Sequence, residues 1–161
     1  MPTALRRSDL RVIHITVGPK PREGSDSSPL RRAANEQGDN RFKALFARGT
    51  AAHSIVDCLV PLNDELVLNK TTRSAFNPTA SELPLRNTGI DGLVMCRVQT
   101  NAYVERTARD AADLGFKCAI ADDACQCFPP VMCNATMMSF ASLFGKVWDT
   151  ARVLQWLEAG S

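Results

Sequence analysis

GLVMCRVQTNAYVERTARDAA, residues 92–112, is the stretch that decides the fold. It opens with the apolar run Leu93–Cys96, passes through the polar turn Gln99–Asn101, and continues with small or apolar residues at positions 104, 108 and 111. A strand that is apolar on both faces is typical of a parallel sheet covered by helices. The i, i+4, i+7 spacing places one small-residue face against that sheet. A strand, a tight turn and a helix N-terminus together form the place where α/β proteins bind ligands.

Strands and helices alternate on both sides of this stretch. The patterns predict strands at residues 10–17, 65–69, 92–98, 116–121 and 146–149. They predict helices at 79–88, 101–114, 134–144 and 151–158, short helical turns at 42–46 and 54–59, and a long loop at 18–41. This alternation predicts an α/β fold with a parallel sheet and right-handed crossovers.

The totals bound the class of protein. At 161 residues we expect a single domain, and 45% hydrophobic with 22% charged residues is ordinary for a globular chain. A formal net charge of +2 does not indicate a surface that binds nucleic acid. No apolar run approaches the ~20 residues that span a bilayer, and the N-terminus has no signal-peptide pattern. We therefore expect a cytoplasmic protein without a membrane or nucleic-acid partner.

Cysteine and histidine usage predicts neither a disulfide framework nor a metal centre. Without a secretion signal, the six cysteines are expected to be free thiols. Cys125, Cys127 and Cys133 lack a CxxC spacing and a neighbouring histidine, so we expect no zinc and no other cofactor. One of the pair Cys125 and Cys127 could replace a catalytic nucleophile, although small residues in a loop are the simpler interpretation.

Most of the chain resembles the isochorismatase-like hydrolases, the cysteine-hydrolase superfamily that includes nicotinamidases and carbamoylsarcosine amidases. The specific part is TNAYVERTARDAADLGF, at residues 100–116. The other matching segments, in order, are VIHITVG (12–18), GTAAHSIVDCL (49–59), ELVLNKTTRSAF (65–76), LRNTGIDGLVMCRVQ (85–99), ADDAC (121–125) and GKVWDTARVLQWL (145–157). The resemblance implies a single three-layer α/β/α sandwich domain of Rossmann-like topology over residues 1–161. It also implies a small-molecule substrate and a homo-oligomer, either dimer or tetramer.

The resemblance also implies a set of site residues, because family members use an Asp–Lys–Cys triad. Lys70 matches the lysine, whereas Tyr103 occupies the cysteine position. The aspartate has no counterpart, since the chain lacks the usual first strand that carries it. That strand is central in the family, between the strands matching 10–17 and 92–98, so its loss would expose two sheet edges. Val98–Gln99 matches a non-proline cis peptide, and the amides of Gln99 and Tyr103 match the oxyanion donors.

Losing the cysteine removes thiol-based hydrolysis, because a phenol with a pKa near 10 is a poor nucleophile at pH 7. The family's isochorismatases also lack that cysteine and use the aspartate, which has no counterpart here. Two hypotheses follow. The first is an enzyme for a small, aromatic or carboxylated metabolite, by family a hydrolase, otherwise an isomerase, cyclase or decarboxylase. The second is a catalytically degenerate homologue that serves as a binding or oligomer-forming subunit.

Each candidate residue has a functional and a simpler interpretation. Lys70 could polarise a carbonyl or lower a neighbour's pKa, or it could be a solvated lysine at a strand end. Tyr103 could be a general acid or hydrogen-bond donor, or an aromatic ring that fills a closed pocket. Arg97 takes the place of the family's usual glycine. It could bind a carboxylate substrate, or it could pair with Asp122 or Asp123 or point through a sheet edge to water.

The remaining candidates are substrate-binding residues of the same site. Asn101 belongs to the polar turn, and Phe76 lies in the loop that the family places on the substrate side. Phe128 and Trp148 could line a pocket for a flat ligand, or they could be ordinary core aromatics.

Overall fold

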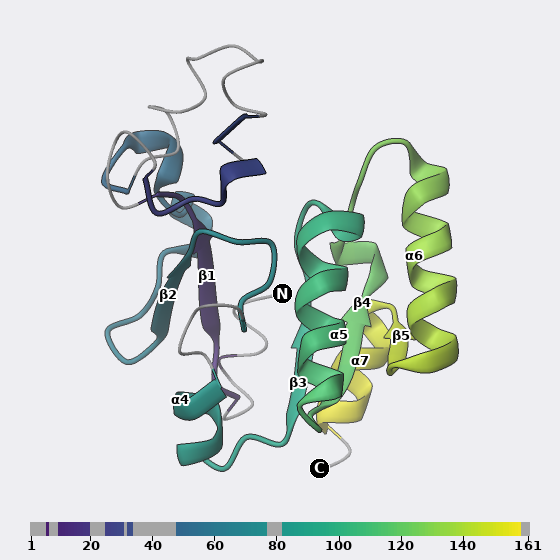
Figure 1. Ribbon diagram of the computed structural model, residues 1–161. Helices are drawn as coiled ribbons and strands as arrows, with labels where there is room; N and C mark the ends of the chain where they lie inside the picture. Colours follow the sequence, from purple (N-terminus) through teal and green to yellow (C-terminus); the bar gives the residue numbers. More distant parts are fainter. Residues whose placement is uncertain are drawn as a thin grey trace. The chain divides into compact units, whose positions relative to one another are not determined.

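The computed structural model describes Arg6 and residues 10–19, 25–30, 32–33, 48–76 and 82–158 (Figure 1). These residues fall into two compact units, one within residues 11–79 and the other within residues 80–161 together with the first ten. Each unit is described by itself. The predicted helical turn at 42–46 and most of the predicted loop at 18–41 lie outside the described residues.

The first unit contains a pair of parallel strands, β1 (Ile13–Val17) and β2 (Leu66–Lys70). Their register runs from Ile13 opposite Leu66 to Val17 opposite Lys70. β-Branched residues dominate β1, as suits a pleated surface. Two 3₁₀ turns, η1 (Ala51–His53) and η2 (Asp57–Leu59), lie in the connection between the strands. These turns replace the single helical turn predicted at 54–59.

The second unit contains a parallel three-stranded sheet in the order β3-β4-β5. Its strands are β3 (Gly92–Met95), β4 (Lys117–Ala121) and β5 (Lys146–Trp148). Its helices are α4 (Glu82–Asn87), α5 (Glu105–Asp113), α6 (Pro130–Leu143) and α7 (Thr150–Glu158), with the 3₁₀ turn η4 (Asp122–Ala124) after β4. The α/β fold and the parallel pairing of all five predicted strands are therefore confirmed.

The core of the second unit lies between β4 and its helices. Ala108 and Ala111 of α5 are completely buried, and so is Ile120 of β4. The small-residue face predicted for this helix therefore packs against the sheet, since a small side chain lets helix and strand approach closely. Helices α5 and α6 lie side by side (Figure 1). Phe140 of α6 is also fully buried, and its ring stacks on that of Phe144 with centroids 6.1 Å apart.

Several element boundaries differ from the sequence predictions. β3 ends at Met95 rather than at residue 98, because the chain turns into the site described below. α6 begins at Pro130 instead of residue 134. Proline suits the first turn of a helix, where its missing N–H has no partner to lose. The prediction that β3 is buried on both faces is wrong at Val94, which is 41% exposed.

The two sheets remain separate in the described part of the chain. β1 pairs there with β2 alone, and β3 pairs there with β4 alone. Each of these strands therefore has a single strand neighbour in the described part of the chain.

Candidate functional site

The turn that joins β3 to α5 is the centre of the candidate site. It contains a cis peptide bond between Val98 and Gln99, as the sequence predicted. A single π-helical turn, Thr100–Val104, follows and leads directly into α5. The backbone N–H of Tyr103 donates to the carbonyl oxygen of Gln99 at 3.0 Å, and those of Ala102 and Val104 approach the same oxygen at 3.4 Å. Three amides thus converge on one acceptor at the start of the helix.

This turn is held to the segment that follows β4. The side chain of Thr100 is completely buried, and its backbone N–H donates to the carbonyl oxygen of Gln126 at 3.0 Å. Val98 and Gln126 form an isolated parallel bridge beyond the ends of β3 and β4. The position of the turn therefore depends on residues more than twenty places later in the chain.

Arg97 and Tyr103 are electrostatic neighbours in the turn. Partial burial of the guanidinium lowers the pKa of Arg97. The electrostatic interaction with Tyr103 raises this pKa and is the smaller effect. Nε of Arg97 donates to the carbonyl oxygen of Val98 at 3.2 Å. Asp123, one of the expected partners of Arg97, accepts hydrogen bonds from the backbone N–H of Thr150 at 2.9 Å and from its hydroxyl at 2.6 Å.

Lys70 lies in the first unit, at the C-terminal end of β2. It is only 2% exposed, and its ammonium group donates a hydrogen bond to the carbonyl oxygen of Arg73. The interpretation of Lys70 as a solvated strand-end lysine is therefore wrong. Phe76, in the loop that follows, is half-buried, and its backbone N–H donates to the Ser74 hydroxyl at 3.1 Å. A cation in this position can polarise an oxygen or stabilise an anion.

The remaining site candidates differ in exposure. Asn101 and Tyr103 are half-buried in the π-helical turn, whereas Gln99 is exposed. Phe128 is 81% exposed, so no pocket of the described structure encloses its ring. Trp148 is half-buried, and its ring lies against that of Trp156 with centroids 5.8 Å apart.

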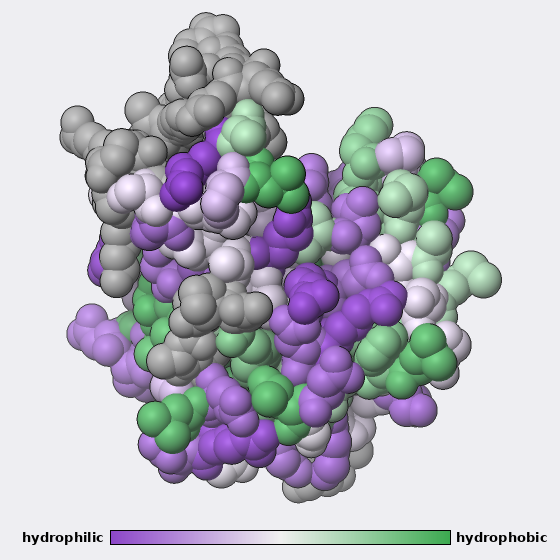
Figure 2. Space-filling model, in the orientation of Figure 1, coloured by the Kyte–Doolittle hydropathy of each residue, from purple (hydrophilic) through white to green (hydrophobic). Residues whose placement is uncertain are grey.

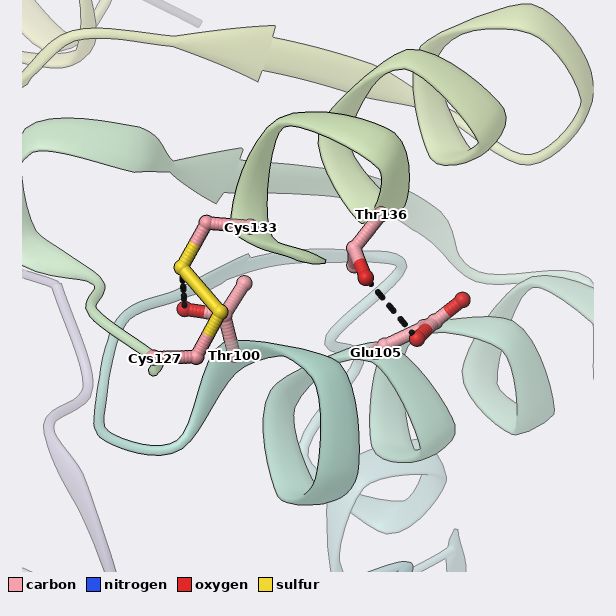
Figure 3. Close-up of a disulfide and its surroundings, with 5 residues drawn as sticks. All are labelled: Thr100, Glu105, Cys127, Cys133 and Thr136. Atoms are coloured by element: carbon pink, nitrogen blue, oxygen red, sulfur yellow. Dashed lines mark hydrogen bonds between the residues drawn. A yellow bond between two sulfur atoms is a disulfide. The ribbon is translucent and has the colours of Figure 1, made fainter. Parts of the chain in front are cut away.

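The prediction that all six cysteines are free thiols is wrong for two of them. Cys127 and Cys133 form a disulfide that links the segment after β4 to the first turn of α6 (Figure 3). The sequence separation of six residues gave no signal for this pairing. Cys125 remains a free thiol. Burial raises its pKa to about 11, which disfavours it as a replacement nucleophile at neutral pH.

The first unit also contains a polar network that the sequence did not predict. Nδ2 of Asn69 donates to the carbonyl oxygen of Gly18 at 2.9 Å, so its Oδ1 faces the Thr16 hydroxyl at 3.1 Å and His53 Nε2 at 2.8 Å. This arrangement requires a proton on His53 Nε2. The network borders a cavity of about 460 Å³, also lined by Arg48 and Ser54. Sequence spacing gives no signal for it, since its members come from three separate segments.

Three further observations concern metal ligands, membrane-spanning helices and the hydropathy of the surface. Among the described residues, no three His, Cys, Asp or Glu side chains are grouped so as to hold a metal ion. No helix in the described part of the chain is both long and apolar enough to cross a membrane. Hydrophilic and hydrophobic side chains are interspersed over the face drawn in Figure 2. The turn that joins β3 to α5 offers a guanidinium, a phenol and backbone amides.

Comparison with known proteins gives one family. The isochorismatase domain profile matches residues 2–152. Ureidoacrylate amidohydrolase RutB of Acinetobacter baylyi is 37% identical over 107 residues, covering 66% of this chain and 44% of the relative. RutB of Methylorubrum extorquens is 31% identical over 157 residues, covering 92% of this chain and 63% of the relative. The chain thus spans less than two thirds of the length of these two relatives.

Solved structures give the same result for the fold. An isochorismatase family protein from Desulfovibrio vulgaris superposes with a TM-score of 0.86 at 25% identity, covering 98% of this chain and 80% of the other. A cysteine hydrolase from Pseudomonas syringae superposes with a TM-score of 0.86 at 23% identity, covering 99% of this chain and 78% of the other. The fold is thus the α/β sandwich of these proteins.

Proposed function

Because this chain belongs to the isochorismatase family, we propose that it is an enzyme acting on a small carboxylated or aromatic metabolite without a cysteine nucleophile. The two relatives above are named as amidohydrolases of ureidoacrylate, a carboxylate that carries a ureido group. Hydrolysis of an amide or ureido bond is accordingly the first reaction to test. An isomerisation, cyclisation or decarboxylation needs no thiol and is the second.

The observation that carries this proposal is the burial of Lys70, which is only 2% exposed. Removing an ammonium group from water costs several kcal/mol unless nearby groups compensate for the lost hydration. The hydrogen bond to the carbonyl oxygen of Arg73 offsets part of that cost. A lysine that stabilises negative charge on a substrate or an intermediate gains from its burial, because its charge acts more strongly away from water.

Tyr103 supplies the second group in the proposed mechanism. A phenol is a hydrogen-bond donor at neutral pH, so it can protonate or polarise a reacting oxygen, whereas a thiol at this position would have attacked the carbonyl carbon. We assign the backbone amides of Gln99 and Tyr103 to the developing oxyanion. The Tyr103 amide must then share its hydrogen between the substrate and the Gln99 carbonyl, which accepts it at 3.0 Å. In this proposal the substrate-binding groups of the second unit are Arg97 and Asn101, for the carboxylate, and Phe128, for the apolar part. Phe76 is the substrate-binding candidate of the first unit.

A turnover screen tests the proposal. Ureidoacrylate and a panel of aromatic amides and carboxylates are incubated with the protein, and the products are identified by mass spectrometry. We expect product from the wild type and a loss of about 100-fold or more in Lys70→Met, which keeps an unbranched side chain but removes the charge. Tyr103→Phe tests the phenol in the same way. Lys146→Ala is the matched control, because Lys146 is an exposed strand lysine. Equal turnover by all four proteins would refute the assignment.

A second candidate function, a binding or assembly subunit, is supported by the sheet edges. β1 and β3 each have one strand neighbour in the described part of the chain, and Val94 of β3 is 41% exposed. Such edges favour strand addition from another chain. Light scattering should then give a dimer or tetramer, and Val94→Lys should shift it toward the monomer, because a charge on an edge strand opposes pairing. A monomeric wild type would exclude this candidate.

A further inference from the structure

Four cysteines lie at the C-terminal ends of β3 and β4 or just beyond them. Cys96 follows β3, and Cys125 and Cys127 follow β4, while Cys133 lies in the first turn of α6. Cys127 and Cys133 form the disulfide, with their Cα atoms 5.7 Å apart, and the other two are free. That Cα separation is the usual one for a disulfide. The cross-link joins the segment after β4 to the first turn of α6, which the backbone otherwise connects through a short bend.

The disulfide lies directly against the turn of the candidate site. Sγ of Cys133 is 3.6 Å from the hydroxyl oxygen of Thr100, the buried residue that opens the π-helical turn (Figure 3). The residue before Cys127 is Gln126, whose carbonyl oxygen accepts the Thr100 amide. Cys133 therefore contacts Thr100 of the turn, and Cys127 is next in sequence to Gln126, whose carbonyl oxygen holds the turn. A few residues away, Thr136 of α6 donates to Glu105 of α5 at 3.2 Å and ties the two helices together.

We propose that Cys127–Cys133 is a thiol–disulfide exchange site that controls how firmly residues 98–104 are held, with a dithiol as its co-reactant. In the oxidised form the segment at Gln126 and the first turn of α6 move as one body against Thr100. In the reduced form each can move separately. Regulation of catalysis by this site rests on the function proposed above, whereas the effect on the turn does not.

The exposure of the two cysteine residues indicates the direction of attack. Cys127 is only 4% exposed, whereas Cys133 is half-buried. A thiolate of the dithiol attacks Cys133 Sγ, the bond to Cys127 Sγ breaks, and Cys127 leaves as a thiolate that takes up a proton. The second thiol of the reductant then displaces Cys133, which also takes up a proton, and the reductant leaves as a cyclic disulfide. Two electrons and two protons are transferred in all.

An external reductant is required because attack by a neighbouring free thiol would only exchange one protein disulfide for another, with no net reduction. Burial raises the pKa of Cys125 to about 11 and also raises the pKa of Cys96. Both groups therefore stay protonated at neutral pH, and only the thiolate attacks a disulfide. The cross-link is in this way protected from internal rearrangement. In a cytoplasmic protein, which the sequence led us to expect, a disulfide is typically transient and either catalytic or redox-sensing.

Peptide mapping and hydrogen exchange test the inference. The folded protein is treated with an oxidant or with dithiothreitol, free thiols are blocked in acid, and the Cys127 and Cys133 peptides are mapped without reduction. Amide exchange is then followed across residues 98–104 in both forms. We expect a cross-linked peptide in the oxidised sample and exchange in this turn at least about threefold faster after reduction, because local opening becomes easier. Exchange in β4 and β5 should not change.

Two variants complete the test. Cys127→Ala/Cys133→Ala should exchange rapidly at residues 98–104 with or without dithiothreitol, whereas Cys58→Ser, which alters an exposed thiol of the first unit, should respond as the wild type does. Only free, blocked Cys127 and Cys133 in the oxidised sample would overturn the inference. So would identical exchange in the two redox forms. Neither readout uses a substrate, so a failure of the proposed function leaves this result interpretable.

Discussion

The backbone N–H of Thr100 donates to the carbonyl oxygen of Gln126 at 3.0 Å, and this bond joins the two consecutive strand ends that build the candidate site. Thr100 opens the helix that follows β3, and Gln126 belongs to the segment after β4. In a parallel sheet the carboxyl ends of neighbouring strands meet at one edge, where α/β proteins bind ligands. The turn of the candidate site is therefore positioned by two connections, the one that follows β3 and the one that follows β4.

Gly145 provides a sharp test of packing between α6 and β5. A Cβ atom at this position would overlap the carbonyl of Cys118 and lie 2.9 Å from the ring of Phe140. Neither neighbour can move easily, because Cys118 belongs to β4 and Phe140 is fully buried. We expect Gly145→Ala to lower the free energy of unfolding by about 3 kcal/mol, measured by urea denaturation.

Gly92→Ala is the matched control for this substitution. A Cβ atom there would lie 3.7 Å from the carbonyl oxygen of Lys117, an ordinary contact. Its effect should stay within about 1 kcal/mol. An equal loss in both variants would show that the packing around Gly145 is looser than described.

Asp123 should stabilise the start of α7. Its carboxylate accepts the backbone N–H of Thr150 at 2.9 Å and the Thr150 hydroxyl at 2.6 Å. Asp123→Ala leaves both donors to water and should cost about 1–2 kcal/mol of stability, as the loss of a helix cap does. Asp122→Ala, next to it in the chain, serves as the control and should cost less than about 0.5 kcal/mol. A reversed order in thermal denaturation would contradict the capping role.

Cys118 should make stability fall in alkaline solution. Burial raises the pKa of its thiol from 9.0 to about 11. Between these values the unfolded chain loses the thiol proton while the folded chain keeps it, so the stability contributed below pH 9 is lost as pH rises toward 11. The loss from this group is at most on the order of 2–3 kcal/mol. Urea denaturation at several pH values should show a weaker alkaline decline in Cys118→Ala than in the wild type. Parallel curves would refute this.

Local patterns were enough to predict the central elements of the fold. The spacing of Val104, Ala108 and Ala111 predicted the buried face of α5, because helix periodicity depends only on neighbours along the chain. The start of α6 had a local signal too, Pro130 in the first turn, that the sequence analysis overlooked.

Contacts between distant segments could not be predicted in the same way. The disulfide of Cys127 and Cys133 depends on how the segment after β4 meets the first turn of α6, and the bond between His53 and Asn69 depends on the packing of a turn against β2. The burial of Lys70 likewise follows from tertiary structure, since its neighbours in sequence are the polar Asn69 and Thr71. The spacing of residues along the chain does not reveal such contacts.

Binding by the protein with and without the Lys70 charge tests the central claim most directly. Titration calorimetry with ureidoacrylate and with aromatic carboxylates and amides would compare the wild type with Lys70→Met and the exposed-lysine control Lys146→Ala. We expect at least one compound to bind the wild type and Lys146→Ala equally and to bind Lys70→Met at least about tenfold more weakly, or about 1.4 kcal/mol. Equal affinity in all three proteins would contradict a functional site at Lys70. Absence of binding throughout, with a stable oligomer in solution, would favour the assembly subunit.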